Sequence, residues 1–414
     1  MHTDAQEQTI LVLNSGSSSL KFGLFARGTR HTHASDTAHA DDDDDDDDEA
    51  LLLEGAAEGI GRGDGRLRIK ASDGRVLLQQ EQRLETQTDA LQKLSQVLAQ
   101  QHHARPVAVG HRVVHGGPHL RTHQRLTGEV RRRLREALHF APLHIPPALA
   151  LIDEATKIFG DATHFACFDT AFHATLPPRA AQFALPRRYA DAGVIRYGFH
   201  GLSYESLVAQ LGAALPPRAV FAHLGNGSSV CALLDGQSVD TSMGLTPTGG
   251  IPMGTRSGDL DPGVLLYLMR AEKLDADALE TLLNRHSGLA GYADGESDMQ
   301  ALEKRAASGD AQAALAIDAF ASAVRKTIGG YAALLGGIDL LVFTGGIGEH
   351  SAQVRRRVCE GLAFLGLAEN DPSGPNDLAG KVRVLHTEEE KQIARHCRAL
   401  LRDETAQSPG AGPR

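Results

Sequence analysis

A chain of 414 residues is too long for one ordinary core, so two domains of common size are expected. Its formal net charge is −10, but the run Asp41 to Asp48 supplies eight of those charges, which leaves −2 for the rest and excludes a basic nucleic-acid-binding face. No stretch approaches about eighteen apolar residues, and the first residues lack the basic and apolar regions of a signal peptide, so a cytoplasmic protein without a membrane span is expected. The four cysteines lie far apart without metal-ligand spacing and are expected to be reduced and buried.

The first part of the chain alternates predicted strands with predicted helices, a pattern typical of α/β layers. Strands are predicted at residues 10–13, 20–25, 107–114 and 163–168, and helices at 128–140 and 147–159. Residues 31–49 carry the aspartate run and no large apolar side chain, so they are expected to form a disordered acidic insertion. Loose binding of a divalent ion by these carboxylates is the alternative.

The second part becomes more helical towards the C-terminus. Strands are predicted at 220–224, 230–234, 340–344 and 382–385, and helices at 262–271, 276–284, 298–307, 311–335, from about 351, and at 388–401. Residues 404–414, which are rich in Pro, Gly and Ser, are expected to be a disordered tail.

A short loop sequence occurs twice, at residues 13–18 (LNSGSS) and 224–229 (LGNGSS), each time between two apolar runs. Both copies predict a strand, a tight turn and a second strand, which indicates an internal duplication. An ordinary hairpin turn is the alternative for either copy alone. A turn of Gly, Asn and Ser directs backbone N–H groups and hydroxyls towards one point, which suits a phosphate oxygen.

A third glycine cluster, Gly345 to Glu349, follows the strand predicted at 340–344 and precedes a predicted helix. Glycines between a strand and a helix permit close approach of a nucleotide. None of the three loops matches the G-x-x-x-x-G-K-[ST] pattern, so the P-loop class of nucleotide-binding proteins is not expected.

Four polar residues stand beside the ends of predicted strands or in glycine-rich loops: Arg112, Asp169, His200 and Arg256. Two arginines in apolar, glycine-rich segments predict an anion held by guanidinium groups. A structural ion pair is the alternative for each charged residue, and a buried structural histidine is the alternative for His200.

These residues lie in segments that resemble the acetate kinase family. The segments follow the family's order along nearly the whole chain, at 14–22, 110–117, 141–144, 168–173, 196–201, 223–228, 253–262 and 343–349. The resemblance implies the duplicated actin, Hsp70 and sugar-kinase fold, with two RNase-H-like domains around a nucleotide cleft. Residues 1–169 and a C-terminal helix at 389–403 would form the first domain, and residues 170–388 the second, nucleotide-binding domain. The resemblance also implies a homodimer that reversibly transfers a phosphoryl group from ATP to acetate with magnesium, or alternatively manganese.

The same resemblance implies a role for each matching position. Asn14 and Glu389 match the metal site, Arg112 the residue that binds the substrate carboxylate, and Asp169, His200 and Arg256 the catalytic group. The acyl pocket corresponds to Val114, Leu143, Phe199 and Pro247. The ATP site corresponds to Lys21, His223, Leu224, Gly225, Asn226, Gly227, Asp298, Met299, Gln300, Gly346, Ile347, Gly348, Glu349 and His350.

The ionisation state of the proposed substrate argues against a general-base role for Asp169. A small carboxylic acid titrates near a glutamate side chain, at about 4.3, so it is already ionised at neutral pH and needs no general base. Asp169 is therefore better interpreted as orienting Arg112, a metal-bound water or the acceptor.

Several positions around this centre depart from the family pattern: Ile145, Leu202, Tyr204, Gly249, Gln300, His350 and Glu388. Because of these departures, the resemblance does not decide which acyl-chain length or which nucleotide the protein prefers. The alternatives are a propionate or other short-chain acyl kinase and, in another class, an Hsp70- or actin-like conformational ATPase. Arg112 and the apolar pocket argue against the second, because an ATPase of that kind needs no carboxylate-binding arginine.

Overall fold

The computed structural model describes residues 8–16, 19–28, 49–61, 63–101, 105–142, 144–367 and 380–407. The chain divides into two compact units, the first comprising residues 1–171 and 388–414 and the second residues 172–387. The acidic run 41–48 and residues 408–414 lie outside the described residues. No helix in the described ranges is both long enough and apolar enough to cross a membrane.

The first unit is built on an eight-stranded sheet with the order β5-β4-β3-β2-β1-β6-β8-β7. Strand β1 pairs antiparallel with β2 and parallel with β6, and β6 pairs parallel with β8. The strands are β1 (Ile10–Ser15), β2 (Leu20–Arg27), β3 (Glu49–Glu58), β4 (Arg66–Ala71), β5 (Val76–Glu81), β6 (Ala108–Val113), β7 (Gln124–Arg125) and β8 (Thr163–Phe168).

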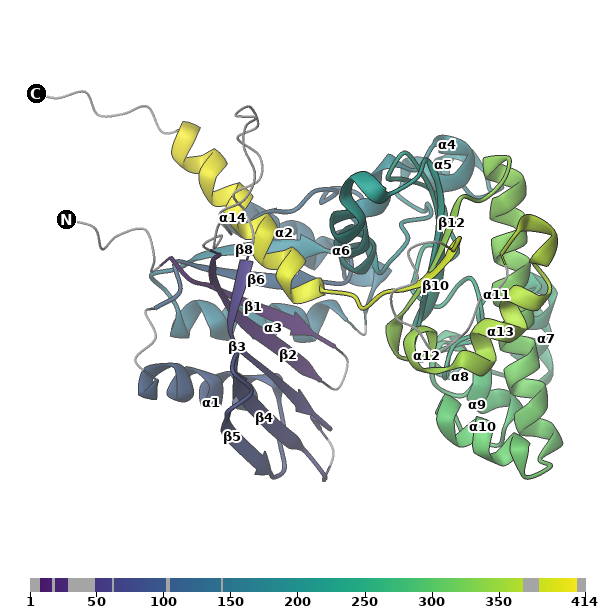
Figure 1. Cartoon of the computed structure of the whole chain (residues 1–414), viewed down its shortest axis with the longest axis horizontal. Helices are drawn as coiled ribbons and strands as arrows, with labels where there is room; N and C mark the ends of the chain where they lie inside the picture. Colours follow the sequence, from purple (N-terminus) through teal and green to yellow (C-terminus); the bar gives the residue numbers. More distant parts are fainter. Residues whose placement is uncertain are drawn as a thin grey trace, which may run out of the picture. The chain divides into compact units, whose positions relative to one another are not determined.

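Helices cover both faces of this sheet (Figure 1). They are α1 (Gln87–Gln100), α2 (Gly128–Glu136), α3 (Ile145–Ile158) and α14 (Glu389–Gln407). Leu11 and Leu13 share an apolar cluster with side chains of α1 and α3. Helix α14 packs on the opposite face. It lies so close to β6 that a Cβ atom at Gly110 would be 2.5 Å from Ile393 and 2.7 Å from Cys397 of that helix. Only glycine permits this close approach of helix to strand.

The second unit repeats the central topology of the first. Its five strands are β9 (Arg218–Leu224), β10 (Ser228–Leu234), β11 (Gln237–Thr241), β12 (Leu340–Thr344) and β13 (Val382–Val384), in the order β11-β10-β9-β12-β13. This order corresponds to β3-β2-β1-β6-β8, and each neighbouring pair has the same direction in both sheets. The duplication predicted from the repeated loop is therefore confirmed.

Ten α-helices of the second unit lie among the described residues. They are α4 (Pro178–Ala181), α5 (Arg187–Asp191), α6 (Gly201–Leu211), α7 (Pro262–Ala271), α8 (Ala276–Arg285), α9 (Gly288–Tyr292), α10 (Met299–Ala307), α11 (Ala311–Leu335), α12 (Gly345–His350) and α13 (Ala352–Glu360). Val220 and Ala222 of β9 pack in one core with α11, while Phe221 packs in another with α6. Alternate residues of a strand face opposite sides, so β9 is buried on both faces.

Some predicted boundaries were wrong. The helix predicted at 128–140 ends at Glu136 and continues as a 3-10 turn, Ala137–Phe140. The helix predicted from residue 147 begins at Ile145, because two prolines are accommodated in a first turn whose N–H groups have no helical partner. The third glycine cluster does not merely precede a helix but itself forms the short helix α12.

Both limits of the expected disorder also need correction. Glu49, predicted to end the acidic insertion, is 3% exposed in β3. Its carboxylate accepts hydrogen bonds from Nε and Nη2 of Arg398 on α14. Residues 404–407, predicted to begin the tail, belong to the last turn of α14. Buried charges persist when they are paired, so the segment that contributes Glu49 has a defined place in the fold.

Candidate active site

The candidate site in the first unit is centred on Arg112. Arg112 precedes the last residue of β6, and Asp169 directly follows β8, the parallel neighbour of β6. Parallel strands end at the same edge of a sheet, which is where ligands of open α/β sheets bind. Nε of Arg112 donates to Asp169 Oδ1 at 3.0 Å, and Nη2 donates to Oδ2 at 2.6 Å. The two side chains are 17% and 2% exposed.

The Arg112 guanidinium is held firmly in its charged form. Burial alone would lower its pKa, but the negative charges of Asp169 and Glu389, the hydrogen bonds to Asp169 and the charge of Glu390 raise the pKa above its ordinary value. Nη1 also lies 3.3 Å from Asn14 Oδ1 and 3.3 Å from the carbonyl oxygen of Ser15. The cation is therefore fixed in position before any substrate binds.

Oxygen-bearing side chains gather beside this cation. Nδ2 of Asn14 donates to Glu389 Oε2 at 3.0 Å and to Glu390 Oε1 at 2.7 Å. Lys21 is exposed on β2 directly opposite Asn14 in the strand register. Glu390 was missed by the sequence analysis, although the run Glu388 to Glu390 is visible in the sequence.

The first glycine loop is held in place by hydrogen bonds to Gln87, a residue of α1. Ser15 Oγ donates to Gln87 Oε1 at 2.8 Å, and Gln87 Nε2 donates to the carbonyl oxygen of Gly16 at 2.7 Å. Gln87 is the first residue of α1, far from the loop along the chain. No local pattern marks this amide as a partner of the loop.

Of the residues predicted for the acyl pocket in this unit, Val114 is half-buried immediately after β6. Leu143 lies outside the described residues.

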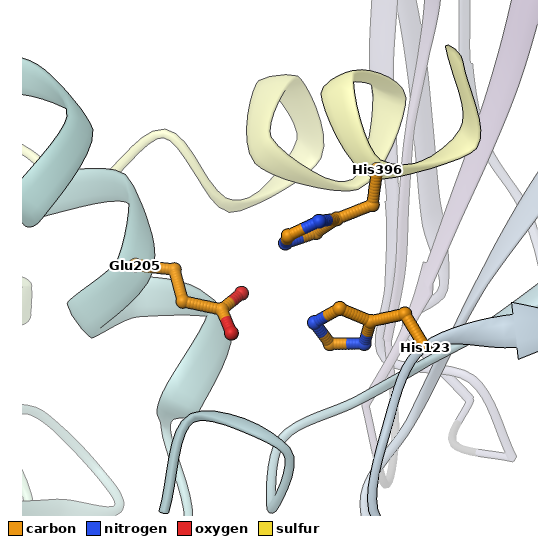
Figure 2. A group of neighbouring side chains, drawn as sticks. All are labelled: His123, Glu205 and His396. Carbon is orange, nitrogen blue, oxygen red and sulfur yellow. The ribbon is translucent and has the colours of Figure 1, made fainter. Parts of the chain in front are cut away.

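Two histidines lie together in the same unit. Figure 2 shows His123 and His396, whose ring centroids are 4.0 Å apart. Glu205, drawn in the same figure, comes from α6 of the second unit. The backbone N–H of Phe168 donates to Nδ1 of His123 at 3.0 Å, so a neutral His123 carries its proton on Nε2. A protonated nitrogen is not a metal ligand, and His123 is better explained as fixing the end of β8 next to Asp169.

The candidate site in the second unit contains His200, which begins α6 with a left-handed φ of 59°. Its Nδ1 lies 2.8 Å from Ser229 Oγ, and its ring stacks on His223 with the centroids 4.2 Å apart. Nδ1 of His223 in turn lies 2.9 Å from Ser203 Oγ. A non-glycine residue in this backbone region costs about 1 to 3 kcal/mol and persists where the surroundings fix it, as the Ser229 contact and the stacked His223 ring do here.

His200 and Arg256 converge on the second glycine loop. A Cβ atom at Gly227 would lie 3.4 Å from His200 Nε2 and 3.4 Å from Arg256 Nη1. The arginine is positioned by a bond from Nη1 to the carbonyl oxygen of Pro247 at 3.1 Å. His200 and Arg256 therefore both approach the backbone at Gly227, which has no side chain. Nitrogen groups of this kind stabilise developing negative charge.

The second and third glycine clusters are also neighbours. Gly345 has a φ of 77°, and a Cβ atom there would lie 2.7 Å from the carbonyl oxygen of Leu224 and 3.2 Å from His223 Nε2. A Cβ atom at Gly225 would lie 3.8 Å from the backbone nitrogen of Gly346. Glycines separated by more than a hundred positions thus form one backbone surface, with Asn226 in the turn beside it.

Other residues predicted to bind ATP have structural roles. The side chains of Leu224 and Met299 are buried in the apolar core, so only their backbones remain for a ligand. Asp298 caps α10 by accepting from the N–H of Ala301 at 2.9 Å. Glu349 accepts from the N–H of Gly345 at 3.0 Å and lies 2.9 Å from His386.

Four further ATP-site residues differ in exposure. Gln300 and His350 are exposed, Ile347 is half-buried, and Gly348 is buried against Phe343. In the predicted acyl pocket, Phe199 and Pro247 are both buried in the second unit. The carbonyl oxygen of Phe199 lies 3.0 Å from Nε2 of His173.

Comparisons with known proteins agree over nearly the whole chain. A model of the acetokinase family matches residues 9–395. An acetate kinase of Methylocella silvestris is 43% identical over 95% of this chain and 98% of its own, and one of Rhodopseudomonas palustris is 41% identical over 94% and 97%.

Solved structures agree as well. A propionate kinase of Francisella tularensis has a TM-score of 0.80 at 33% identity, covering 94% of this chain and 98% of its own. An acetate kinase of Porphyromonas gingivalis has a TM-score of 0.79 at 33% identity, covering 95% and 100%. The predicted duplicated α/β fold is confirmed. The chain belongs to the acetokinase family.

Proposed function

We propose that this chain reversibly transfers the terminal phosphoryl group of ATP to acetate, giving ADP and acetyl phosphate. Membership of the acetokinase family supports a kinase whose acceptor is a carboxylate. The observation that carries the proposal is the Arg112 guanidinium, fixed by Asp169 at the carboxyl edge of the first sheet. The alternative of a conformational ATPase has no comparable support.

Arg112 has the donors that a carboxylate acceptor needs. Asp169 uses the edge formed by Nε and Nη2, so the edge formed by Nη1 and Nη2 is directed away from it. Nη1 makes two longer contacts there, at 3.3 Å to Asn14 Oδ1 and to the carbonyl oxygen of Ser15, which the substrate would replace. In this proposal the acetate carboxylate binds along that second edge, in the two-bond geometry that guanidinium groups favour. Acetate is ionised at neutral pH, so Asp169 positions the cation and removes no proton.

The second unit would act on the transferred group. Phosphoryl transfer spreads negative charge over three equatorial oxygens, and its catalysis is mostly positioning and electrostatic stabilisation. His200 and Arg256 would stabilise that charge, while the glycine surface at 225–227 and 345–346 would admit the phosphates of ATP. Lys21 would contact a phosphate from the first unit.

The first unit has a donor set suited to a magnesium ion. Glu389 and Glu390 bring carboxylate oxygen atoms together around Nδ2 of Asn14, and carboxylate oxygens are ligands of the kind that Mg²⁺ prefers. A site with few protein ligands suits an ion that also binds phosphates. When bound, the ion would neutralise charge on the phosphates. The choice of magnesium over manganese is part of the proposal.

The acyl pocket would be lined by Val114, Phe199 and Pro247, with Leu143 outside the described residues. Their small apolar surfaces favour acetate, and propionate remains the second candidate, since a propionate kinase is among the similar structures. One methylene group is worth only about 1 to 3 kcal/mol of discrimination.

We also propose a homodimer in the cytoplasm. Helix α7 has no buried residue and exposes Val264, Leu266, Tyr267 and Met269, next to the exposed Leu260. A helix this apolar is expected to be covered, and a second copy of the chain is the proposed partner. The cytoplasm supplies ATP and keeps thiols reduced, in agreement with four buried cysteines that form no disulfide.

The test is an acyl-hydroxamate assay with purified protein, ATP and magnesium, using acetate, propionate and butyrate in parallel. Acetate should give the highest kcat/KM, and chelation of magnesium should abolish product. Hydrolysis of ATP without any hydroxamate product would instead indicate an ATPase. Sedimentation of wild type and Leu266→Glu tests the dimer separately, because only the dimer proposal predicts dissociation.

A further inference from the structure

The ring of His200 is held by two hydroxyl groups in series. Ser229 Oγ lies 2.8 Å from His200 Nδ1 and 2.5 Å from the hydroxyl oxygen of Tyr204. Ser229 and Tyr204 are both fully buried. All three residues belong to the second unit, and Tyr204 lies one helical turn after His200 on α6.

Burial determines the direction of the two hydrogen bonds. It raises the pKa of Tyr204 well above its usual value, with Cys231 acting in the same direction, while Ser229 and the backbone of His223 oppose the rise. The phenol therefore keeps its proton, and a buried O–H group needs an acceptor. Ser229 Oγ is at the right distance to accept it, and the serine hydrogen is then available for donation to His200 Nδ1.

We propose that Tyr204 and Ser229 are positioning residues that hold His200 as the neutral tautomer with its proton on Nε2. A neutral imidazole carries one proton, so accepting at Nδ1 leaves the N–H group at Nε2. That nitrogen faces Gly227, beside Nη1 of Arg256. The relay thus supplies a fixed donor where the proposed function, on which this inference rests, requires one for the transferred phosphoryl group.

The surrounding groups also favour the neutral ring. Arg256 contributes a positive charge from the loop after β11, which disfavours a second positive charge on the nearby His200 ring. Protonation of Nδ1 would further require the buried serine hydrogen to turn away from His200. Neutral histidine is an effective donor to developing negative charge in other enzymes.

Tyr204 was noted above as a departure from the family pattern. The relay is therefore a property of this chain's own residues. It also accounts for a buried tyrosine hydroxyl so close to the proposed site.

The direct test is ¹⁵N NMR of the full-length protein labelled at histidine, with His200→Gln used to assign the His200 resonances. Wild type should show a protonated Nε2 and an unprotonated Nδ1 at neutral pH. In Tyr204→Phe the serine no longer has to donate, so a mixture of tautomers is expected. A wild-type ring protonated at Nδ1, or at both nitrogens, would overturn the proposal whether or not any variant folds.

Kinetics provide the second readout. Tyr204→Phe should lower kcat roughly two- to tenfold, the effect of one hydrogen bond, with both KM values unchanged. Tyr197→Phe is the matched control, because Tyr197 is equally buried in the same unit and donates to the carbonyl oxygen of Gly193 at 2.8 Å, outside the relay. Equal kcat for Tyr204→Phe and wild type, together with an unchanged tautomer, would exclude the relay. Full activity of His200→Gln would instead refute the role of His200 in the proposed function.

Discussion

Glu49 and Arg398 form a buried ion pair that joins β3 to α14, although Glu49 directly follows eight consecutive aspartates. The two residues are 3% and 6% exposed. Because of this pairing, the Glu49 carboxylate is part of the folded structure, although it is next to the acidic run in the sequence.

Deleting residues 31–48 should leave the free energy of unfolding nearly unchanged. Arg27 pairs with Glu49 in the β2–β3 register, so residues 28–30 would remain as a three-residue hairpin connection. Glu49→Gln should instead destabilise the protein by about 3 to 5 kcal/mol, because it leaves the Arg398 charge buried without its partner. Urea unfolding measures both, with Glu54→Gln on the exposed side of β3 as the control. A large loss of stability in the deletion would show that the segment packs against the fold.

Arg112→Leu should raise the KM for acetate roughly tenfold to a hundredfold, the effect of losing hydrogen bonds to a charged group. The KM for ATP should change little. Arg112→Lys keeps the charge but loses the two-bond geometry, so its acetate KM should lie between those of wild type and Arg112→Leu. Steady-state kinetics with each substrate varied in turn decides this. An unaltered dependence on acetate would mean that the carboxylate binds elsewhere.

Arg256→Ala and His200→Ala should each lower kcat by about a hundredfold to a thousandfold, because both groups are proposed to act on charge that develops in the transition state. Nucleotide affinity, measured by calorimetry, should remain close to that of wild type. Arg285→Ala and His286→Ala, at exposed positions of the same unit, are the controls. Near-normal turnover in both site variants would refute the assignment.

Val114→Ala should improve propionate relative to acetate. The substitution removes two methyl carbons from the wall of the proposed acyl pocket, which enlarges the space for a longer chain. The ratio of kcat/KM values for the two acids measures this, and wild type should favour acetate within roughly two orders of magnitude. A wild-type preference for butyrate, or a ratio that Val114→Ala leaves unmoved, would place the pocket elsewhere.

Stability should fall as the solution becomes acidic, through the buried pair His111 and His164. Nε2 of His111 lies 2.9 Å from Nδ1 of His164, and Nε2 of His164 lies 3.2 Å from the carbonyl oxygen of Phe159. Burial lowers the pKa of both rings, and Arg131 adds to this. The unfolded chain therefore binds more protons below its histidine pKa of about 6.5, so the stabilisation is complete above that pH and is lost below it.

Urea unfolding between pH 5 and 7.5 tests this dependence. The double variant His111→Gln/His164→Gln should show a shallower increase of stability with pH than wild type. The slope, and not the absolute stability, is the readout, because the substitutions also change packing. His286→Gln controls for an exposed histidine. Identical slopes in wild type and the double variant would rule out the pair as the cause.

The sequence predicted the parts of the fold that are local. Strand–turn–strand patterns and the repeated glycine loop gave the central strands, and Arg112 and Asp169 could be selected because each stands at the end of an apolar strand. Gln87 and Glu390 could not be selected in this way, and Ser229, although it belongs to the second repeated loop, could not be assigned to His200. Each is joined to the site by a hydrogen bond between segments distant in the chain, and nothing in its immediate sequence records that contact.

Glu49 shows the opposite error. A prediction from composition averages over neighbouring residues. Glu49 follows eight aspartates, so it was predicted to belong to the same solvated segment. Its burial depends on Arg398, 349 positions later, which a composition window does not include.

The placement of α14 on the first sheet also sets an order of assembly during synthesis. Residues 172–387 are continuous, so the second unit has all its elements before the ribosome reaches the last helix. The first sheet is made earlier, but its β1 and β6 face stays uncovered, and Arg398 is not yet available to Glu49, until α14 emerges. Domains generally fold as units while the chain is made. Here the part translated first is completed last, so C-terminal truncation is expected to damage the N-terminal sheet.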